Sequence, residues 1–310
     1  MYINLIITSI ALNILCLVVL QKYFIKKGKI ATINKRSSHS SIATNSGGLA
    51  LFVTIFTISA FLYLTGIEIF DYKILVPLSL ITLIGVYDDI NIVDFKLKLL
   101  FQIITAKIII DQGFIISNLH GVLGIFELSS IISQLLTIFI IVAIINAINF
   151  IDGIDGLALM VLSVFIISFE FFALNFDEFH NLSQILIAGS LPMWYFNLRK
   201  KQKIFLGDAG SLLIGTIISI YTITILSNNY LIKPVFDLHK IIFVISILLY
   251  PIVDIIRIFF LRISMRKSPF VADKNHIHHI LLNRFKSHTA IVIIIFSITL
   301  LTICITQIIF

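Results

Sequence analysis

The sequence is poor in charged residues. Asp, Glu, Lys and Arg occupy 13% of its 310 positions, whereas 59% of the residues are hydrophobic and the mean hydropathy is +1.08. A soluble domain usually carries about 25% charged residues, and this chain has no polar half that could form one. The shortage of charge therefore excludes a soluble globular protein and indicates an integral membrane protein.

Cysteine is also scarce. Cys16 and Cys304 both lie inside apolar runs, so the sequence predicts no disulfide framework, zinc site or redox motif. Residues 2–20 lack a basic n-region, and we expect them to form a first membrane span rather than a cleaved signal. Because no repeat or low-complexity linker interrupts the chain, residues 1–310 are predicted to form a single membrane domain.

Apolar runs recur along the whole chain, and most approach the roughly 20 residues that a helix needs to cross a bilayer. They fall near residues 2–20, 47–65, 74–87, 97–110, 129–148, 157–174, 183–197, 211–226, 241–261 and 290–308. The predicted fold is an all-α polytopic membrane protein with about ten transmembrane helices.

Basic residues are concentrated in alternate connectors between these runs. One set of connectors comprises residues 21–46, 88–96, 149–156, 198–210 and 262–289. Counted to Lys98, this set holds 18 of the 23 Lys and Arg residues. The positive-inside rule places it in the cytoplasm and both termini outside. The net charge of +7 then reports topology, and we expect no nucleic-acid partner.

In the outer set of connectors, residues 111–128 form a longer segment with three glycines. Glycines between short apolar stretches favour turns. We expect a small β-hairpin in this outer connector.

Glutamate is absent from the predicted cytoplasmic connectors. Their acidic residues are Asp88, Asp89, Asp94, Asp152, Asp155, Asp208 and Asp273. Solvated charged surfaces normally mix Asp and Glu, whereas short carboxylates beside glycine suit metal or phosphate sites. The aspartates therefore mark candidate functional loops.

The second connector, GVYDDINIVDFKLKLLFQ, places Asp88 and Asp89 side by side at a membrane boundary. Two adjacent carboxylates either share a cation or raise the pKa of one of them, which would make it a base. Lys98 follows and could bind a phosphate. The alternative is a helix end whose charges face water.

The third connector, NAINFIDGIDGLA, spaces Asn146, Asn149, Asp152 and Asp155 three residues apart, so that they share roughly one face of a helix. Gly153 allows close backbone approach or a break in the helix. Polar groups between apolar runs of a membrane protein are usually functional. A solvated turn is the alternative.

The fourth connector, KIFLGDAGSLLIG, sets Asp208 between glycine-containing turns just before an apolar run. A glycine-rich turn at a helix N-terminus binds anions, and an aspartate there can hold Mg²⁺ against phosphates. A flexible turn with a serine N-cap is the alternative.

Two other connectors supply basic groups. In the fifth connector, His276, His278 and His279 could donate to phosphate or sugar oxygens. Zinc binding lacks a further compact ligand set, and a purely structural role is a third reading. In the first connector, Arg36 and His39 could contact a phosphate, or the loop could bind lipid headgroups.

All five motifs lie on the predicted cytoplasmic side. Together they suit Mg²⁺-dependent transfer of a phosphorylated group between a cytosolic nucleotide and a lipid whose phosphate lies at the membrane surface. A transporter is the alternative class, and it would need ionisable groups near the midplane. Lys107, Asp254 and Arg257 are the obvious candidates there, and the last two can pair with each other.

Five strings in the chain occur in the order typical of one enzyme family. They are SSHSSIATNSGG, GVYDD with KLKLLFQ, NAINFIDGIDGLA, FLGDAGS and SPFVADKNHIHH. With these strings the chain resembles the polyprenyl-phosphate N-acetylhexosamine-1-phosphate transferases, the WecA/TagO/MraY superfamily, from about residue 35 to 285. The string HIHH is more similar to the WecA/TagO branch than to the MraY branch.

The resemblance implies transfer of a HexNAc-1-phosphate, first of all GlcNAc-1-phosphate, from its UDP-sugar to undecaprenyl phosphate, with release of UMP. This reaction would start a lipid-linked surface glycan of the O-antigen, teichoic acid or capsule type. UDP-GalNAc, UDP-FucNAc, UDP-QuiNAc and the MraY-type muramoyl-pentapeptide are alternative donors. The resemblance also implies Mg²⁺, with Mn²⁺ as a substitute, a bacterial inner membrane, contact with membrane lipids, a site facing the cytoplasm, and a homodimer.

The resemblance further implies roles for individual residues. Asp208 would bind Mg²⁺, joined by Asn149, and Asp88 and Asp89 would serve the acceptor, with Asp88 deprotonating the lipid phosphate. The nucleotide-binding candidates are Asn146, Asp152, Gly153, Asp155, Asn197 and Phe205. Those for the diphosphate and sugar are Lys98, His276, His278 and His279, and those for the lipid phosphate are Arg36 and His39. We expect direct in-line attack by the lipid phosphate.

Overall fold

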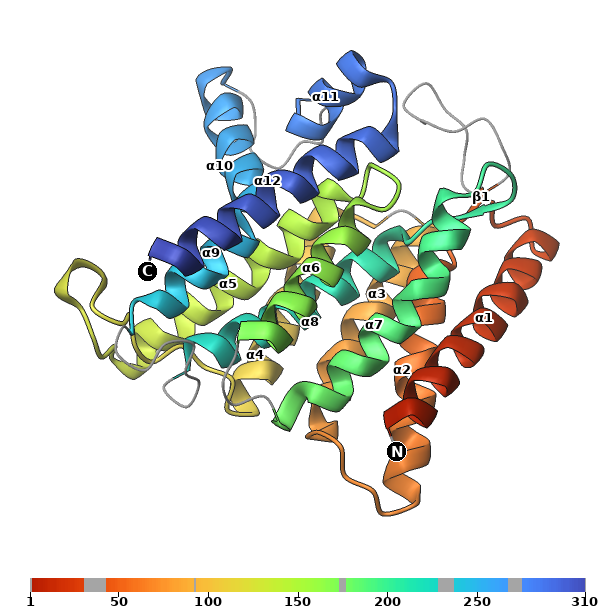
Figure 1. Ribbon diagram of the computed structural model, residues 1–310, viewed down its shortest axis with the longest axis horizontal. Helices are drawn as coiled ribbons and strands as arrows, with labels where there is room; N and C mark the ends of the chain where they lie inside the picture. Colours follow the sequence, from red (N-terminus) through yellow and green to blue (C-terminus); the bar gives the residue numbers. More distant parts are fainter. Residues whose placement is uncertain are drawn as a thin grey trace. The chain divides into compact units, whose positions relative to one another are not determined.

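The chain is almost entirely helical in a computed structural model (Figure 1), which confirms the predicted all-α class. The structure describes residues 2–30, 43–91, 93–172, 177–227, 237–266 and 275–309. The predictions for Arg36, His39 and Asp273 lie outside these residues. The helices are α1 (Tyr2–Lys26), α2 (Gly47–Leu64), α3 (Leu75–Asn91), α4 (Phe95–Asp111), α5 (Ser130–Ile151), α6 (Leu157–Phe172), α7 (Asp177–Leu198), α8 (Gly207–Leu226), α9 (His239–Ile247), α10 (Leu249–Ser264), α11 (Ile277–Phe285) and α12 (His288–Ile309).

Several of these helices are long and apolar enough to cross a membrane. Within the described residues there are 6 such helices, or 7 if the bent pair α9–α10 counts as one span. The protein is therefore a multi-pass membrane protein, but the predicted number of about ten spans is not confirmed. Among the helices outside this count, α4 has 17 residues and α6 has 16, less than a perpendicular crossing of the hydrocarbon core requires.

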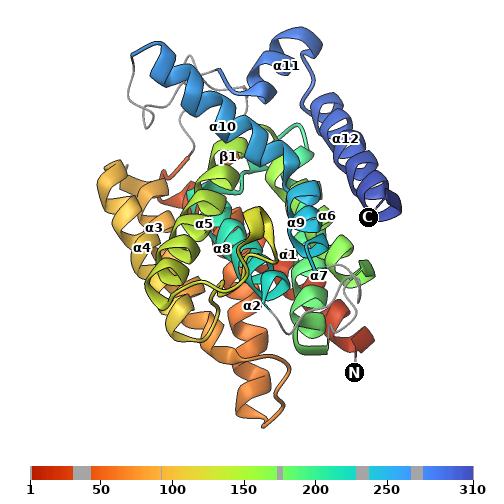
Figure 2. The ribbon, with the colours of Figure 1, turned by 90° about the vertical axis from the view of Figure 1, so that its left-hand side faces the viewer.

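The apolar run at 241–261 is broken into two helices. Helices α9 and α10 meet at 77°, and Figure 2 shows them joined at an angle. Leu248 lies at the break with non-helical angles of φ −92° and ψ 14°. Pro251 follows in the first turn of α10, where its missing N–H does no harm. The bend gives α10 a direction of its own.

The chain packs as two compact units, residues 1–94 with 176–213 and residues 95–175 with 214–310. In the first unit, α1 packs along α2 and α7 (Figure 1). In the second unit, α5 packs against α4 and α10, and α12 packs against α6 and α9. The prediction of a single domain over residues 1–310 stays a prediction.

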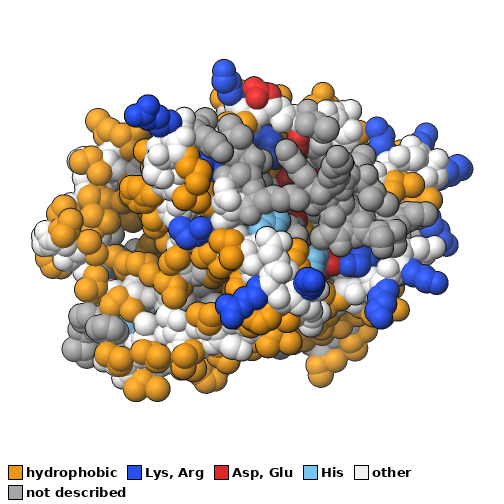
Figure 3. Space-filling model, turned by 90° about the horizontal axis from the view of Figure 1, so that it is seen from above, with side chains coloured by type: hydrophobic (Ala, Val, Ile, Leu, Met, Phe, Trp, Pro, Cys, Tyr) orange, Lys and Arg blue, Asp and Glu red, His pale blue; other side chains and the backbone are white. Residues whose placement is uncertain are grey.

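Two connectors of the predicted cytoplasmic set meet in the first unit. Strands β1 (Ala43–Thr44) and β2 (Lys203–Ile204) pair in parallel. The connectors that contain them therefore lie on the same side of this unit, as their alternation along the chain predicts. Many Lys and Arg side chains, with some histidines, are visible on the face seen in Figure 3. Orientation in a membrane stays a prediction.

The outer connector, residues 111–128, was predicted to form a small β-hairpin. Residues 112–129 are all described and contain a single antiparallel bridge, between Asn118 and Glu127. The 3-10 turn Val122–Gly124 lies in the loop between these two residues. Gly121 adopts φ 85°, which glycine tolerates best. The β-hairpin is thus not confirmed, although the connector doubles back on itself.

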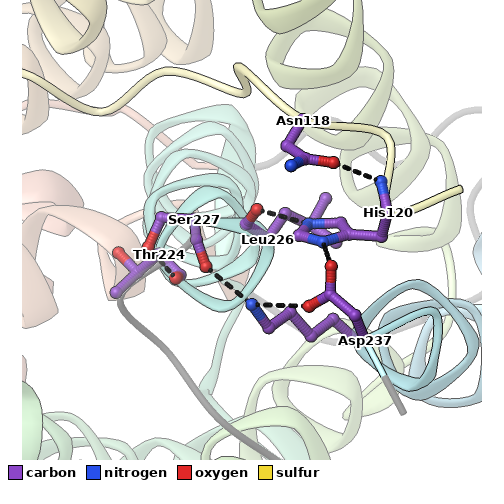
Figure 4. Close-up of polar contacts among 7 residues, drawn as sticks. Asn118, His120, Thr224, Leu226, Ser227 and Asp237 are labelled. Carbon is purple, nitrogen blue, oxygen red and sulfur yellow. Dashed lines mark hydrogen bonds and ion pairs between the residues drawn. The ribbon is translucent and has the colours of Figure 1, made fainter. Parts of the chain in front are cut away.

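A buried histidine fastens this connector to the rest of the second unit (Figure 4). His120 Nδ1 contacts Asp237 Oδ2, and Nε2 lies 2.8 Å from the carbonyl oxygen of Leu226. Both ring nitrogens thus face oxygen atoms, one of a carboxylate and one of the backbone. Lys240 Nζ bonds Asp237 Oδ1 and the carbonyl oxygen of Ser227, each at 3.1 Å. The connector at 111–128 is therefore held to the end of α8 and the start of α9.

We expect Asp237→Asn to lower the melting temperature by a few degrees, because the buried His120 ring loses a charged acceptor, at a cost of about 1–3 kcal/mol. Burial alone raises the pKa of Asp237, but the bonds from His120 and Lys240 outweigh it and hold the pKa below 3.8. The pair therefore stabilises above pH 3.8 and loses its effect as pH falls through the lowered pKa. Thermal unfolding measured against pH checks this, and equal curves for Asp237→Asn and the exposed control Asp111→Asn would contradict it.

Candidate active site

In the first unit, Asp89 joins three connectors at the start of α8. Its carboxylate accepts the backbone N–H groups of Asp208 and Ala209, both at 3.0 Å, and the side-chain amide of Asn45 at 2.9 Å. A carboxylate satisfies the free N–H groups of a helix N-terminus and interacts favourably with its dipole. We call Asn45, Asp89 and Asp208 the α8 cluster. By its contacts, Asp89 holds Asp208 in place.

Glycines make this approach of three helices possible. A Cβ on Gly85 of α3 would lie 2.5 Å from Ala209 Cα, and one on Gly48 of α2 would lie 2.0 Å from Gly210 N. Gly207, before Asp208, has φ 73° and no room for a side chain beside Asp89. The glycines of the GVYDD and LGDAGS strings are therefore required by backbone contacts, since a side chain would separate the helices.

Asp88 and Asp208 are the other predicted carboxylates of this unit. Asp88 is buried, with 8% of its surface exposed, and accepts the backbone N–H of Val93. Asp208 opens the first turn of α8, and its charge is close enough to that of Asp89 for the two to repel. Adjacent carboxylates with oxygen atoms as the only ligands fit a hard cation such as Mg²⁺.

The structure also places Asn197 and Phe205 in the first unit. Asn197 Nδ2 on α7 donates to the carbonyl oxygen of Ile204 at 3.0 Å, and Asn197 is buried. The backbone N–H of Phe205 donates to the carbonyl oxygen of Thr44 at 2.8 Å. Asn197 therefore holds β2, and Phe205 continues the pairing of the first and fourth connectors. Their roles toward a nucleotide stay predictions.

In the second unit, three histidines of the fifth connector lie against the third connector. A Cβ on Gly153 would lie 3.4 Å from His278 Nε2 and 3.6 Å from His279 Cε1. The rings of His276 and His278 stack with centroids 5.4 Å apart. Burial, followed by the neighbouring histidines, lowers the pKa of His278 from 6.5 to about 3. His278 is therefore neutral at physiological pH. We call His276, His278 and His279 the histidine cluster.

Asp155 has a partner that the sequence did not suggest. His288, the first residue of α12, places its Nδ1 3.1 Å from both the backbone nitrogen and Oδ2 of Asp155. Asp254 and Tyr250 of α10, which contact the histidine cluster, and Asn45 were likewise missed as site residues. No local pattern singles out His288 or Asn45, because each acts through a contact with a residue distant in sequence.

The other predicted residues of the second unit lie on α4 and on α5 or its end. Asn146 Nδ2 donates to Gln102 Oε1 at 2.8 Å, and Gln102 Nε2 donates back at 3.3 Å, so this amide pair joins α4 to α5. Asp152 ends α5 as its C-cap. Lys98 lies on α4 and Asn149 on α5. The predicted Mg²⁺ ligands Asp208 and Asn149 thus belong to different units, and each is described in its own.

An apolar cavity of about 870 Å³ lies in the second unit, lined by α4, α5, the end of α8, α9 and α10. Asn146, Thr222 and Arg262 are its polar lining residues. The volume lies toward the upper end of the range for ligand pockets. A cavity so uniformly apolar suits a hydrocarbon chain rather than a sugar or nucleotide.

Comparison with known proteins adds a consistent result. The model of glycosyl transferase family 4 matches residues 72–226. The chain is 34% identical to the undecaprenyl-phosphate α-N-acetylglucosaminyl 1-phosphate transferase of Haemophilus influenzae, over 82% of this chain and 72% of that protein. It is 33% identical to a probable undecaprenyl-phosphate N-acetylglucosaminyl 1-phosphate transferase of Bacillus subtilis, over 90% and 77%. It is 30% identical to the decaprenyl-phosphate N-acetylglucosaminephosphotransferase of Mycobacterium tuberculosis, over 87% and 72%.

Proposed function

Because the chain belongs to glycosyl transferase family 4, the superfamily of polyprenyl-phosphate N-acetylhexosamine-1-phosphate transferases, we propose that it transfers GlcNAc-1-phosphate from UDP-GlcNAc to undecaprenyl phosphate. UMP is the second product, and the lipid-linked sugar starts a surface glycan. The observation that carries the proposal is the meeting of the family motifs within each unit, at the α8 cluster and at the histidine cluster. The relatives, named for this reaction with GlcNAc, support the donor.

The reaction needs an oxygen of the lipid phosphate to attack the sugar-linked phosphorus of the donor. The bond between that phosphorus and the bridging oxygen of the donor diphosphate breaks, and UMP leaves with the bridging oxygen. Asp208 would hold Mg²⁺, which when bound would offset the charge of the diphosphate and of the departing UMP. Asp89 keeps Asp208 at the N-terminus of α8, and Lys98 adds a fixed positive charge where negative charge develops.

Asp88 lies next to Asp89 and is our candidate for meeting the lipid phosphate. A phosphomonoester is largely ionised near neutral pH, because its second pKa is about 6. The attack therefore needs little base catalysis, and we infer direct displacement. His278 is neutral and would donate a hydrogen bond to the diphosphate beside Gly153. Asp155, two residues after Gly153, is our candidate for binding the uridine.

The apolar cavity of the second unit is our candidate site for the polyprenyl chain. Its walls are mostly hydrocarbon, and among the described residues that line it Arg262 of α10 is the cationic one. A polyprenyl phosphate needs both, an apolar passage for the chain and a cation near the phosphate. The protein would act in the bacterial inner membrane with its site facing the cytoplasm and both termini outside.

A transfer assay tests the proposal. Membranes that contain the protein are supplied with undecaprenyl phosphate, Mg²⁺ and, in separate reactions, labelled UDP-GlcNAc, UDP-GalNAc, UDP-FucNAc, UDP-QuiNAc or UDP-MurNAc-pentapeptide. We expect an organic-extractable labelled lipid and one UMP per lipid formed, with UDP-GlcNAc as the best donor. Another donor giving the highest turnover would overturn the choice of GlcNAc. The absence of a lipid-linked product with every donor would overturn the proposed transferase function. A labelled UDP-sugar that crosses the membrane of sealed vesicles unchanged would indicate a transporter.

A further inference from the structure

Helix α10 presents two buried polar side chains to the histidine cluster. Tyr250 and Asp254 are four residues apart, so they lie on one face of the helix, and 9% and 1% of their surfaces are exposed. Buried polar groups on an apolar helix are costly unless they do something specific. The proposed reaction assigns neither residue a role.

Asp254 accepts hydrogen bonds from three donors. Its Oδ2 lies 2.6 Å from His276 Nδ1, and its Oδ1 accepts the backbone N–H of Ile277 at 2.8 Å and Arg257 Nη2 at 3.4 Å. A carboxylate that faces Nδ1 requires the proton to be on Nδ1. His276 Nε2 is then the ring nitrogen left for a ligand, and it makes no hydrogen bond within the described part of the chain.

Tyr250 fixes the neighbouring ring in the same way. Its hydroxyl lies 3.0 Å from His278 Nδ1, and a phenol is a better donor than a neutral imidazole, so the hydroxyl donates and Nδ1 accepts. The proton of neutral His278 is then on Nε2. This nitrogen is completely buried, has no hydrogen-bond partner among the residues that the structure describes, and lies beside Gly153. It is a donor oriented toward the third connector.

We propose that Tyr250 and Asp254 are positioning residues for the transfer reaction, which set opposite tautomers of His278 and His276. His278 then presents a donor, Nε2–H, and His276, when its ring is neutral, an acceptor, Nε2, to the sugar nucleotide. This inference rests on the proposed function. Two rings held with different tautomers can match a donor and an acceptor of the same ligand, for example a phosphate oxygen and a sugar hydroxyl, which two freely rotating histidines would do less selectively.

A metal ion held by the same residues is the competing interpretation. Ligand atoms of Asp254, His276 and His278 all lie within 4.8 Å of one another. However, the 2.6 Å between Asp254 Oδ2 and His276 Nδ1 is a hydrogen bond. Two ligands of a tetrahedral zinc ion would stand about 3.3 Å apart. The Tyr250 hydroxyl also makes a hydrogen bond to His278 Nδ1, which is then not available as a metal ligand. The contacts thus favour hydrogen bonds, and metal analysis is part of the test.

The test compares Asp254→Asn and Tyr250→Phe with wild type in the transfer assay with UDP-GlcNAc and undecaprenyl phosphate. The new amide can accept from only one of the two donors, Ile277 N–H and His276 Nδ1–H, unless His276 changes tautomer. A wrong histidine tautomer costs about 10⁴ in kcat in serine proteases. We expect kcat to fall by at least about 100-fold for Asp254→Asn, and by about 5- to 20-fold for Tyr250→Phe, which removes one hydrogen bond. KM for undecaprenyl phosphate should stay within about threefold.

Controls separate positioning from folding. Asp111→Asn and Tyr195→Phe make the same chemical changes at exposed positions and should keep wild-type kcat. The double variant Asp254→Asn/His276→Gln should be no slower than His276→Gln alone, because Asp254 acts through His276. A merely structural Asp254 would instead give multiplying losses, and that result would overturn the proposal, as would wild-type kcat in Tyr250→Phe and Asp254→Asn.

The remaining outcomes are equally decisive. Bound zinc in the purified wild type that disappears in Asp254→Asn would replace our proposal by the metal site. Failure of the proposed function itself would look different, since wild type would then form no lipid-linked product. If Asp254→Asn does not fold, Tyr250→Phe, which preserves the ring and its packing, still decides the question through its kcat.

Discussion

Asp208→Asn is expected to lower kcat of the transfer reaction by at least about 100-fold, a loss of the size expected when a metal-binding carboxylate is removed. Folding should be unaffected, because Asp89 binds the backbone N–H of residue 208 and not its side chain. The measurements are turnover at saturating donor and acceptor, the Mg²⁺ concentration for half-maximal rate, and the melting temperature. The half-maximal Mg²⁺ concentration should rise while the melting temperature stays constant.

Asp89→Asn provides the matched contrast. Its carboxylate accepts three donors, from Asp208, Ala209 and Asn45, and an amide would turn its own donor toward one of them. Each unsatisfied buried group costs about 1–3 kcal/mol. We therefore expect Asp89→Asn to lose both activity and stability. Asp208 would have no role in metal binding if Asp208→Asn kept turnover within about threefold of wild type with an unchanged Mg²⁺ requirement.

The helical fold could be read from the sequence with little error. Each of the ten apolar runs forms helix, since a chain in lipid must satisfy its backbone groups internally. The run at 241–261 was expected as one span and is broken instead at Leu248. Hydropathy does not register such a break, because the apolar character continues through it. Helix α11 was missed for the opposite reason: it is short and polar, with His278, Asn283 and Arg284 among its residues.

Within the site, sequence reasoning found the residue types but not their partners. Asp88 and Asp89 were selected as adjacent aspartates at a membrane boundary, and Asp208 as an aspartate in a glycine-rich turn before an apolar run. The structure distinguishes them, since the Asp89 carboxylate accepts hydrogen bonds from the start of α8 and from Asn45. The pairing of Asp254 with His276 was not foreseen. Asp254 had an obvious partner in Arg257, one helical turn away, and only folding brings α10 to the start of α11.

Asn146 shows a limit of periodicity. Its spacing of three from Asn149 suggested a shared polar face directed at a ligand. In the structure its side chain forms a reciprocal amide pair with Gln102 of α4. In lipid, an amide on one helix is stabilised most readily by an amide on the next. A polar residue between apolar runs therefore signals either a site or a helix contact, and the sequence alone does not distinguish them.

Gly85→Ala is expected to reduce both activity and stability, because the α8 cluster depends on backbone contact between α3 and α8. The added Cβ would lie 2.5 Å from Ala209 Cα and 2.8 Å from the carbonyl oxygen of Asp208. These are backbone atoms, which cannot rotate away, so α3 must move from α8. Overpacking of this kind costs about 1–3 kcal/mol. The movement also pulls Asp89 from the two N–H groups that it accepts, and kcat should fall by about 10-fold or more.

Gly189→Ala on α7 is the matched control. Its Cβ would meet the end of the flexible Leu51 side chain at 3.3 Å, and alanine is about 1 kcal/mol better than glycine inside a helix. We expect wild-type turnover and an equal or higher melting temperature for this variant. If Gly85→Ala behaved like Gly189→Ala in both measurements, the close approach of α3 to α8 would not be what holds Asp208. If Gly85→Ala lost stability but kept full turnover, the contact would support the fold without positioning the site.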